Sequence, residues 1–227
     1  MHKKILQMKK GFTMIEMLMV LAIFTILTSI VMYNYSEFNS KTIMSNMAYE
    51  IALSVRQAQV YSLGVRGQAG NEEFDNRYGV YFNNEYNGGK NFIFFFDKKP
   101  VEAGGEPNGW CDGDANEPNC MACVSGGECL EKVTLTRDIF VGQICISDSI
   151  DPVSENGICN GTNSSKDDAS ITFDRPNPDA KVSTSDTRPY NVPKNVGIVV
   201  KNKFGNQRAV IIRSTGQISV IMLKDAI

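Results

Sequence analysis

The sequence has little histidine: the only one in the 227 residues is His2. Histidine is the usual base of serine and cysteine nucleophiles and a common metal ligand. Without it, the rest of the chain cannot build a histidine-based catalytic triad or a histidine metal site. We therefore expect a protein that is not an enzyme.

Charge is absent from one long segment. No charged residue occurs from Met17 to Tyr35, and no proline from Phe12 to Leu63. A helix from Phe12 to Tyr35 would be about 36 Å long, which is enough to cross a hydrocarbon core of about 30 Å. Four lysines precede it, namely Lys3, Lys4, Lys9 and Lys10. This asymmetry predicts a single-pass protein of the inner membrane with its N-terminus in the cytoplasm and its head outside.

A single carboxylate, Glu16, stands at the start of the apolar segment. A secretory signal has its small-residue cleavage site after the apolar region, whereas here Gly11 precedes it. Cleavage between Gly11 and Phe12 would keep the apolar helix and create an α-amino group four residues from Glu16. Because a carboxylate within the membrane costs up to about 3 kcal/mol and is usually paired, a free amine is its expected partner.

The segment Lys9-Lys10-Gly11-Phe12-Thr13-Met14-Ile15-Glu16, with the apolar run after it, resembles the class III signal of type IV pilins and type II secretion pseudopilins. The resemblance implies a leader, 1–11, removed by a prepilin peptidase after Gly11, N-methylation of Phe12, and a role for Glu16 in filament assembly. It also implies partners: other pilin or pseudopilin subunits, an inner-membrane assembly platform, and membrane lipid before assembly. After assembly the chain would form part of an extracellular or periplasmic filament.

Helical periodicity continues beyond the apolar segment. Apolar residues recur at helical spacing, namely Met44, Met47, Ile51, Val55 and Ala58. Gly64 is a suitable C-terminal stop. We expect 12–36 to be a membrane-spanning and filament-core helix and 37–64 to be its amphipathic continuation.

Residues 65–227 have the pattern of a β-rich head, in which turn signals separate short apolar runs. The candidate strands are Tyr78–Phe82, Phe92–Phe96, Val133–Val141, Ile144–Ser147, Ala169–Asp174, Val196–Lys201, Arg208–Ser214 and Gln217–Leu223. Turns are expected at Asn87-Gly88-Gly89, Gly205-Asn206 and Thr215-Gly216. The fold class is therefore α+β: a long helix packed on an antiparallel β-sheet, as in the pilin-like fold.

Three segments of the head resemble the GspH/FimT class of minor pseudopilins and minor pilins. They are Ala58-Gln59-Val60-Tyr61-Ser62, Ile171-Thr172-Phe173-Asp174, and Arg208-Ala209-Val210-Ile211-Ile212 followed by Ser214-Thr215-Gly216. Phe96-Asp97 and Asn108-Gly109 resemble the loop of that class, with an insertion. The resemblance implies a minor subunit.

All six cysteines lie in a cysteine-rich insertion, 97–168. They are Cys111, Cys120, Cys123, Cys129, Cys145 and Cys159. An even number of cysteines outside the cytoplasm favours disulfides, although six cysteines allow 15 pairings. A zinc ion held by the first four is the alternative, and free thiols are a third.

The segment that begins at Asp112 alternates oxygen donors, as the opening of a calcium loop does: Asp112, Asp114 and Asn116. Glu117 stands where such a loop needs its turn glycine, and Cys123 stands at the twelfth position. A solvated polar turn is the expectation and structural calcium the alternative. No other cofactor is expected.

Nucleic acid is not an expected partner, because the formal net charge is −2. Some FimT-like minor pilins bind DNA through an arginine-rich C-terminal motif, but the matching positions here are Gln217 and Ser219. A basic edge remains conceivable from Lys201, Lys203, Arg208 and Arg213.

The sequence therefore predicts a minor pilin or pseudopilin of a type IV pilus or a type II secretion filament. Two alternatives remain open. One is a DNA-binding minor pilin that serves DNA uptake, and the other is a membrane-anchored extracytoplasmic binding domain that does not polymerise.

Overall fold

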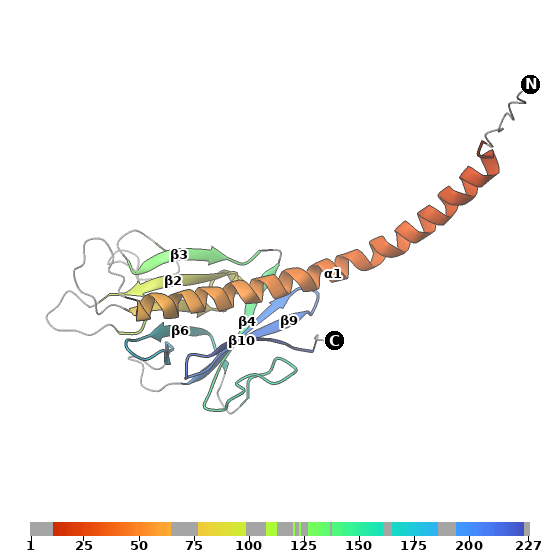
Figure 1. Ribbon diagram of the computed structural model, residues 1–227. Helices are drawn as coiled ribbons and strands as arrows, with labels where there is room; N and C mark the ends of the chain where they lie inside the picture. The colour runs from red at the N-terminus through yellow and green to blue at the C-terminus, as the bar shows by residue number, and fades with distance from the viewer. Residues whose placement is uncertain are drawn as a thin grey trace, which may run out of the picture. The chain divides into compact units, whose positions relative to one another are not determined.

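A computed structural model describes residues 11–64, 77–98, 108–112, 120, 123, 127–136, 138–160, 165–185 and 194–224. The chain divides into two compact units, Met1–Lys41 and Thr42–Ile227, and we call the second unit the head. One helix, α1 (Met14–Leu63), runs through both units, and antiparallel strands follow it (Figure 1). The predicted α+β fold is confirmed.

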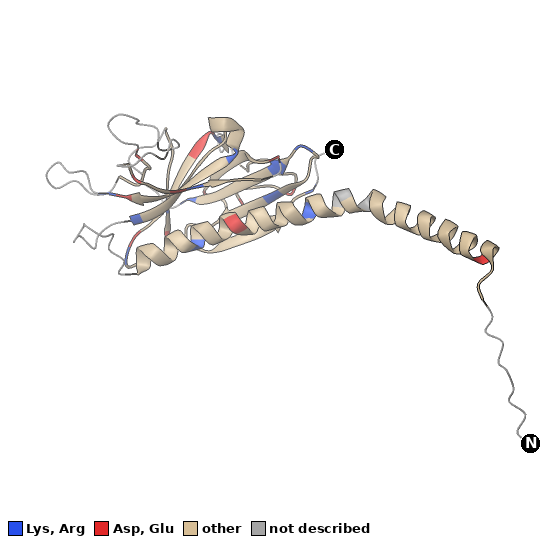
Figure 2. Ribbon diagram, turned by 90° about the horizontal axis from the view of Figure 1, so that it is seen from above, with Lys and Arg blue, Asp and Glu red and all other residues tan. Residues whose placement is uncertain are grey.

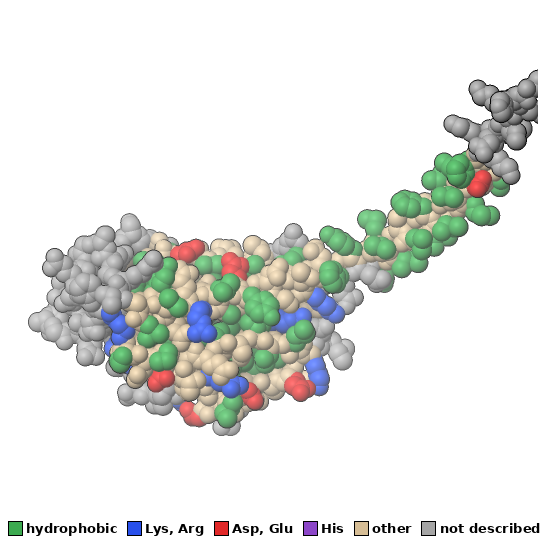
Figure 3. All heavy atoms as spheres, viewed as in Figure 1, with side chains coloured by type: hydrophobic (Ala, Val, Ile, Leu, Met, Phe, Trp, Pro, Cys, Tyr) green, Lys and Arg blue, Asp and Glu red, His purple; other side chains and the backbone are tan. Residues whose placement is uncertain are grey.

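The first unit is the apolar part of α1. The helix begins at Met14, two residues after the predicted start, because Thr13 caps it: the Glu16 N–H donates to Thr13 Oγ1 at 3.3 Å. The apolar side chains of this part are exposed, as the green surface in Figure 3 shows. Thr25 and Thr28 donate their hydroxyl hydrogens to backbone carbonyls of the same helix. The helix is thus long and apolar enough to cross a membrane.

The head contains two five-stranded sheets rather than the single sheet predicted. Sheet 1 has the order β3 (Cys129–Thr134), β2 (Asn91–Asp97), β1 (Arg77–Asn83), β6 (Asp168–Phe173) and β7 (Ala180–Ser183). Sheet 2 has the order β10 (Ile218–Met222), β9 (Gln207–Ile212), β8 (Asn195–Asn202), β4 (Ile139–Ser147) and β5 (Ser165–Lys166). The β1–β2 connection contains the short helix η1 (Tyr86–Gly89), so the hairpin predicted at Asn87-Gly88-Gly89 is confirmed.

The predicted strand Val133–Val141 is wrong. The chain leaves β3 after Thr134 and turns at Asp138, whose φ is 59°, before β4 begins. β4 then continues through an irregularity between Val141 and Gln143 to Ser147, and so absorbs the separate strand expected at Ile144–Ser147. The short strands β5 and β7 were not predicted, because β5 has two residues and the alternation in the four residues of β7 is too short to indicate a strand.

The main core lies between the head part of α1 and both sheets. The helix contributes a fully buried stripe, namely Met44, Ala48, Ile51, Val55 and Ala58. Ala48 replaces the predicted Met47, which is only partly buried. Both sheets pack alternate residues into the same cluster, including Phe92, Phe94 and Phe96 from β2. The helix therefore packs on both sheets and joins them in one core.

The C-terminal end of α1 is fixed by polar contacts. Gln59 Nε2 donates to the carbonyls of Pro178 and Gly216, both at 3.0 Å. Ser62 Oγ accepts from the Tyr78 N–H at 2.8 Å, which attaches the helix to the start of β1. Because these groups are buried, the bonds set the axial position of the helix on the sheets.

Gly216→Ala is expected to destabilise the head by about 3 kcal/mol. Gly216 has a φ of 79°, and an added Cβ would collide with the Pro178 carbonyl and the Gln59 amide. Gly88→Ala is the matched control, since its φ is 63° but the space around it is open, and it should cost only about 1 kcal/mol. Urea denaturation followed by tryptophan fluorescence measures both, and equal losses would contradict the steric argument.

Both sheets are also covered on the face away from this core. On sheet 1, Ile93 and Phe95 pack with Trp110, Cys111 and Cys120 of the insertion. On sheet 2, Val199, Ala209 and Ile211 pack with Val153 and the cysteines Cys145 and Cys159. The run Phe92–Phe96 is therefore buried on both sides, as a continuous apolar strand should be.

Candidate functional site

The N-terminal site consists of the residues around the start of α1. Gly11, Phe12 and Thr13 lie outside the helix, and Phe12 is 77% exposed. The peptide bond between Gly11 and Phe12 is thus in non-helical backbone, where a protease can bind it in an extended conformation. Cleavage after Gly11 and methylation of Phe12 stay predictions.

Glu16 occupies the first turn of the helix. The pattern Thr13-x-x-Glu16, together with the bond from the Glu16 N–H to Thr13 Oγ1, is that of a capping box. A carboxylate here also interacts favourably with the positive end of the helix dipole. In Figure 2 the ribbon is red at the start of α1 and tan along the uncharged stretch that follows. Glu16 therefore has a local structural use in addition to the assembly role that we predict for it.

The second candidate site is the part of the head that carries the six cysteines, on the outer faces of both sheets. All six cysteines form disulfides: Cys111–Cys120, Cys123–Cys129 and Cys145–Cys159. Their Cα atoms are 5.7, 5.1 and 5.1 Å apart. The disulfide interpretation is confirmed, and the zinc and free-thiol alternatives are not, since no thiol remains. The first two bonds are neighbours, because the Cys123 N–H donates to the Cys120 carbonyl at 3.0 Å.

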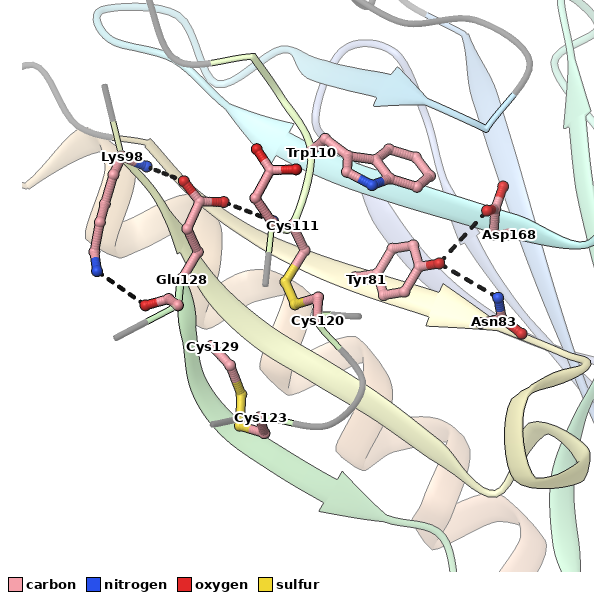
Figure 4. The surroundings of a disulfide bond; sticks show 12 residues. Tyr81, Asn83, Lys98, Trp110, Cys111, Cys120, Cys123, Glu128, Cys129 and Asp168 are labelled. Carbon is pink, nitrogen blue, oxygen red and sulfur yellow. Dashed lines mark hydrogen bonds between the residues drawn. A yellow bond between two sulfur atoms is a disulfide. The ribbon is translucent and has the colours of Figure 1, made fainter. Parts of the chain in front are cut away.

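Two buried carboxylates attach the insertion to sheet 1. Asp97, at the end of β2, accepts from the N–H groups of Asn108 at 3.2 Å and Gly109 at 2.7 Å. Glu128, just before β3, accepts from the N–H groups of Lys98 at 2.7 Å and Asp112 at 2.9 Å (Figure 4). The four oxygens thus satisfy four backbone donors. Sequence reasoning missed Glu128, because a glutamate between Gly127 and Cys129 carries no signal of burial.

Burial raises the pKa of both carboxyl groups, because the charged form loses solvation. The pKa of Asp97 rises from 3.8 to about 7, although the Gly109 N–H and the Arg77 charge oppose the shift. The pKa of Glu128 rises from 4.5 to about 8, with the Asp97 charge adding to the effect and the Asp112 N–H opposing it. The folded head therefore holds protons that the unfolded chain releases.

The stability of the head is expected to fall by several kcal/mol as the pH rises from about 4 to about 8. The sign follows from the raised pKa values: in this window the folded state binds more protons than the unfolded state. Urea midpoints at a series of pH values measure it. Glu128→Gln should lower the stability but flatten the slope; a slope that is unchanged in this variant would refute the assignment.

The other predicted site residues are spread over the head. The Asp112 carboxylate accepts from Asn108 Nδ2 at 2.6 Å, while Asp114 and Asn116 lie outside the described residues. Among the residues that the structure describes, no group of three or more His, Cys, Asp or Glu is placed to hold a metal ion. Structural calcium stays a prediction.

The four basic candidates do not share one environment. Lys203 pairs with Asp138 at 2.5 Å, and Arg213 lies 3.6 Å from Asp151. Arg208 is buried and donates from Nη1 to the Gln207 carbonyl at 2.8 Å. Lys201 is partly buried and lies across the backbone at Gly142. This arrangement does not favour a continuous basic groove, and DNA binding stays untested.

Residues 6–32 match the model of the prokaryotic N-terminal methylation motif. The matched segment contains Gly11, Phe12 and Glu16 and the first part of the apolar helix. No curated protein and no solved structure matches the chain. The motif supports a type IV pilin-like or pseudopilin protein that a prepilin peptidase processes, and with the apolar helix it is consistent with membrane anchoring.

Proposed function

We propose that this chain is a minor pilin or pseudopilin subunit of a type IV pilus or a type II secretion filament. The observation that carries the proposal is the methylation motif at 6–32, which joins a short basic segment to a helix able to cross a membrane. The unassembled subunit would span the cytoplasmic membrane with its head outside. It would then enter a filament through α1.

The chemistry at the N-terminus would proceed in two steps. A prepilin peptidase would hydrolyse the peptide bond between Gly11 and Phe12, and the new amine of Phe12 would then be methylated. The methylated amine keeps its positive charge, so it can still pair with the Glu16 carboxylate of a neighbouring subunit. Such a pair neutralises two charges in an apolar filament core and fixes the axial offset between adjacent helices.

The head supports a minor rather than a major role. Its outer faces are covered by long connections tied by three disulfides, and these connections enlarge the head on both sides. A bulky head is easier to place at the tip of a filament than along a close-packed shaft. The finer assignment to the GspH/FimT class rests on the sequence resemblance of the head.

Mass spectrometry of the membrane-extracted protein tests the proposal. We expect a mature chain that begins with N-methylated Phe12, and Gly11→Leu should leave the full-length chain uncut because the peptidase requires a small residue at this position. Thr13→Ala, which alters the helix cap but not the cleavage bond, is the control and should still be cut. A mature wild-type chain that begins at Met1 would falsify the proposal.

A further inference from the structure

The attachment of the insertion to sheet 1 contains an Asn-Gly pair. Asn108 and Gly109 both donate their backbone N–H groups to the buried carboxylate of Asp97, Asn108 to Oδ1 at 3.2 Å and Gly109 to Oδ2 at 2.7 Å. In such a pair the glycine nitrogen can attack the side-chain amide carbon of the asparagine and close a five-membered succinimide ring. Because glycine has no Cβ, nothing on the second residue hinders this attack. The groups around the pair therefore decide whether it reacts.

The attack requires a base for the Gly109 N–H. Asp97 Oδ2 accepts this hydrogen at a distance at which a general base can act. Burial raises the pKa of Asp97 to about 7, against the opposing effects of the Gly109 N–H and of Arg77 on β1, while the charge of Asp112 adds to the rise. Its ionised form is thus a stronger base than an exposed aspartate and is still present at neutral pH. Asp97 can accept the proton as the nitrogen attacks.

The side chain of Asn108 is held at both of its polar atoms. Oδ1 accepts from the Trp110 N–H at 2.8 Å, which folds the side chain over the following peptide in an Asx turn. Nδ2 donates to Asp112 Oδ2 at 2.6 Å. The Trp110 N–H would stabilise the negative charge that develops on Oδ1 when the carbon is attacked. A base and an oxyanion donor thus meet at one oriented amide.

Two other Asn-Gly pairs within the described part of the chain lack such a base. In Asn87-Gly88 and Asn156-Gly157 the glycine N–H donates to a backbone carbonyl, at 3.1 and 2.9 Å. A peptide carbonyl does not take up a proton at neutral pH. Both of these asparagines are exposed, whereas Asn108 is half-buried. Solvent exposure alone therefore predicts the opposite order of reactivity from the one that the Asp97 carboxylate predicts.

We propose that Asn108 undergoes self-catalysed succinimide formation, with Asp97 as the general base. Gly109 N loses its proton to Asp97 and forms a bond to Asn108 Cγ. The bond from Cγ to Nδ2 then breaks, and Nδ2 leaves as ammonia with the proton that Asp97 took up. Water afterwards opens the ring at either carbonyl and leaves aspartate or isoaspartate at this position. The proposal does not depend on the filament assignment.

The reaction changes how the insertion is attached. The new carboxylate has no N–H to donate to Asp112 and repels its charge instead. An isoaspartate also adds a methylene group to the backbone, which displaces the Gly109 N–H from Asp97. Either product weakens the bonds that hold the insertion on sheet 1. The insertion of an old subunit would therefore be held less tightly than that of a new one.

The test follows the full chain, extracted from membranes in detergent and kept at neutral pH. Peptide mass spectrometry at successive times measures the loss of ammonia and the exchange of the amide NH2 for OH at each Asn-Gly pair. We expect Asn108 to react at least about tenfold faster than Asn87 and Asn156, since a general base typically contributes more than this. Because all three pairs are in one protein, this comparison needs no variant. Equal rates, or a slower reaction at Asn108, would overturn the proposal.

Asp97→Asn tests the base itself. Asparagine still offers an oxygen to the Gly109 N–H but cannot take its proton, so the rate at Asn108 should fall at least about tenfold while the other two pairs react as before. The fluorescence of Trp110, which is buried, reports whether the variant stays folded. Glu128→Gln is the matched control, because this second buried carboxylate of the attachment bonds to other N–H groups. It should keep the fast reaction, and loss in both variants or in neither would refute Asp97 as the base.

Discussion

Glu16→Leu is expected to leave cleavage after Gly11 intact and to reduce incorporation into filaments at least about tenfold, which corresponds to 1.4 kcal/mol per subunit. The substitution removes the only charged residue between Phe12 and Tyr35. Without it, the amine of a neighbouring Phe12 would be buried in the filament core without a partner. Sheared-filament yield, measured beside the amount of processed subunit in the membrane, gives the result.

Glu16→Gln is the control that separates the two uses of this residue. Glutamine at this position suits a capping box with Thr13 as well as glutamate does, and it has no charge. If pairing with the amine drives assembly, both variants lose filaments to a similar extent. If glutamine assembles like the wild type, helix capping explains the glutamate and the predicted charge pair is wrong.

Reduction of the three disulfides is expected to unfold the head at room temperature. They close loops with sequence separations of 9, 6 and 14 residues. Loops of this size stabilise by about 2 to 3 kcal/mol each, together about 8 kcal/mol, which is comparable with the whole stability of a typical domain at about 5 to 15 kcal/mol. Trp110, 4% exposed and packed on Tyr81, reports the change as a red shift of its fluorescence.

Pairwise serine variants locate the effect. Cys145→Ser with Cys159→Ser opens the longest loop and releases Val153 from its packing against Gly197 on sheet 2. Cys123→Ser with Cys129→Ser opens the shortest loop, near Trp110. We expect the first pair to lower the urea midpoint more and the second to change the fluorescence of the native state more. A fully reduced head that keeps the native midpoint would refute the account.

Much of the fold could be predicted because its signals are local. The apolar run, the helical spacing of Met44, Ile51 and Val55, and the stop at Gly64 define α1 almost to its last residue. Turns marked by Gly205 and Gly216 separate β8, β9 and β10 as expected, since positive φ favours glycine. Each of these features depends on residues that are close in the sequence.

The remaining features depend on contacts between distant residues. Nothing local indicates that Asp97 and Glu128 would be buried together, or that the strands would divide into two sheets. The disulfide pairing is likewise a property of the folded chain, because it follows from which loops cross which strands. In the N-terminal site the type and spacing of Gly11, Phe12 and Glu16 carry the prediction, and the capping by Thr13 emerged from the structure.

The insertion connects two neighbouring strands of sheet 1. The chain leaves sheet 1 at the end of β2 and returns on the neighbouring strand β3, where Cys129 pairs with Phe95. No described residue between these strands belongs to the cluster that packs on α1. Changes in this segment that keep its two disulfides and its bonds to Asp97 and Glu128 would therefore leave the packing of the helix intact. In the proposed filament, neighbouring subunits would constrain the sequence of α1, whereas the segment between β2 and β3 would be free to vary with what the head contacts.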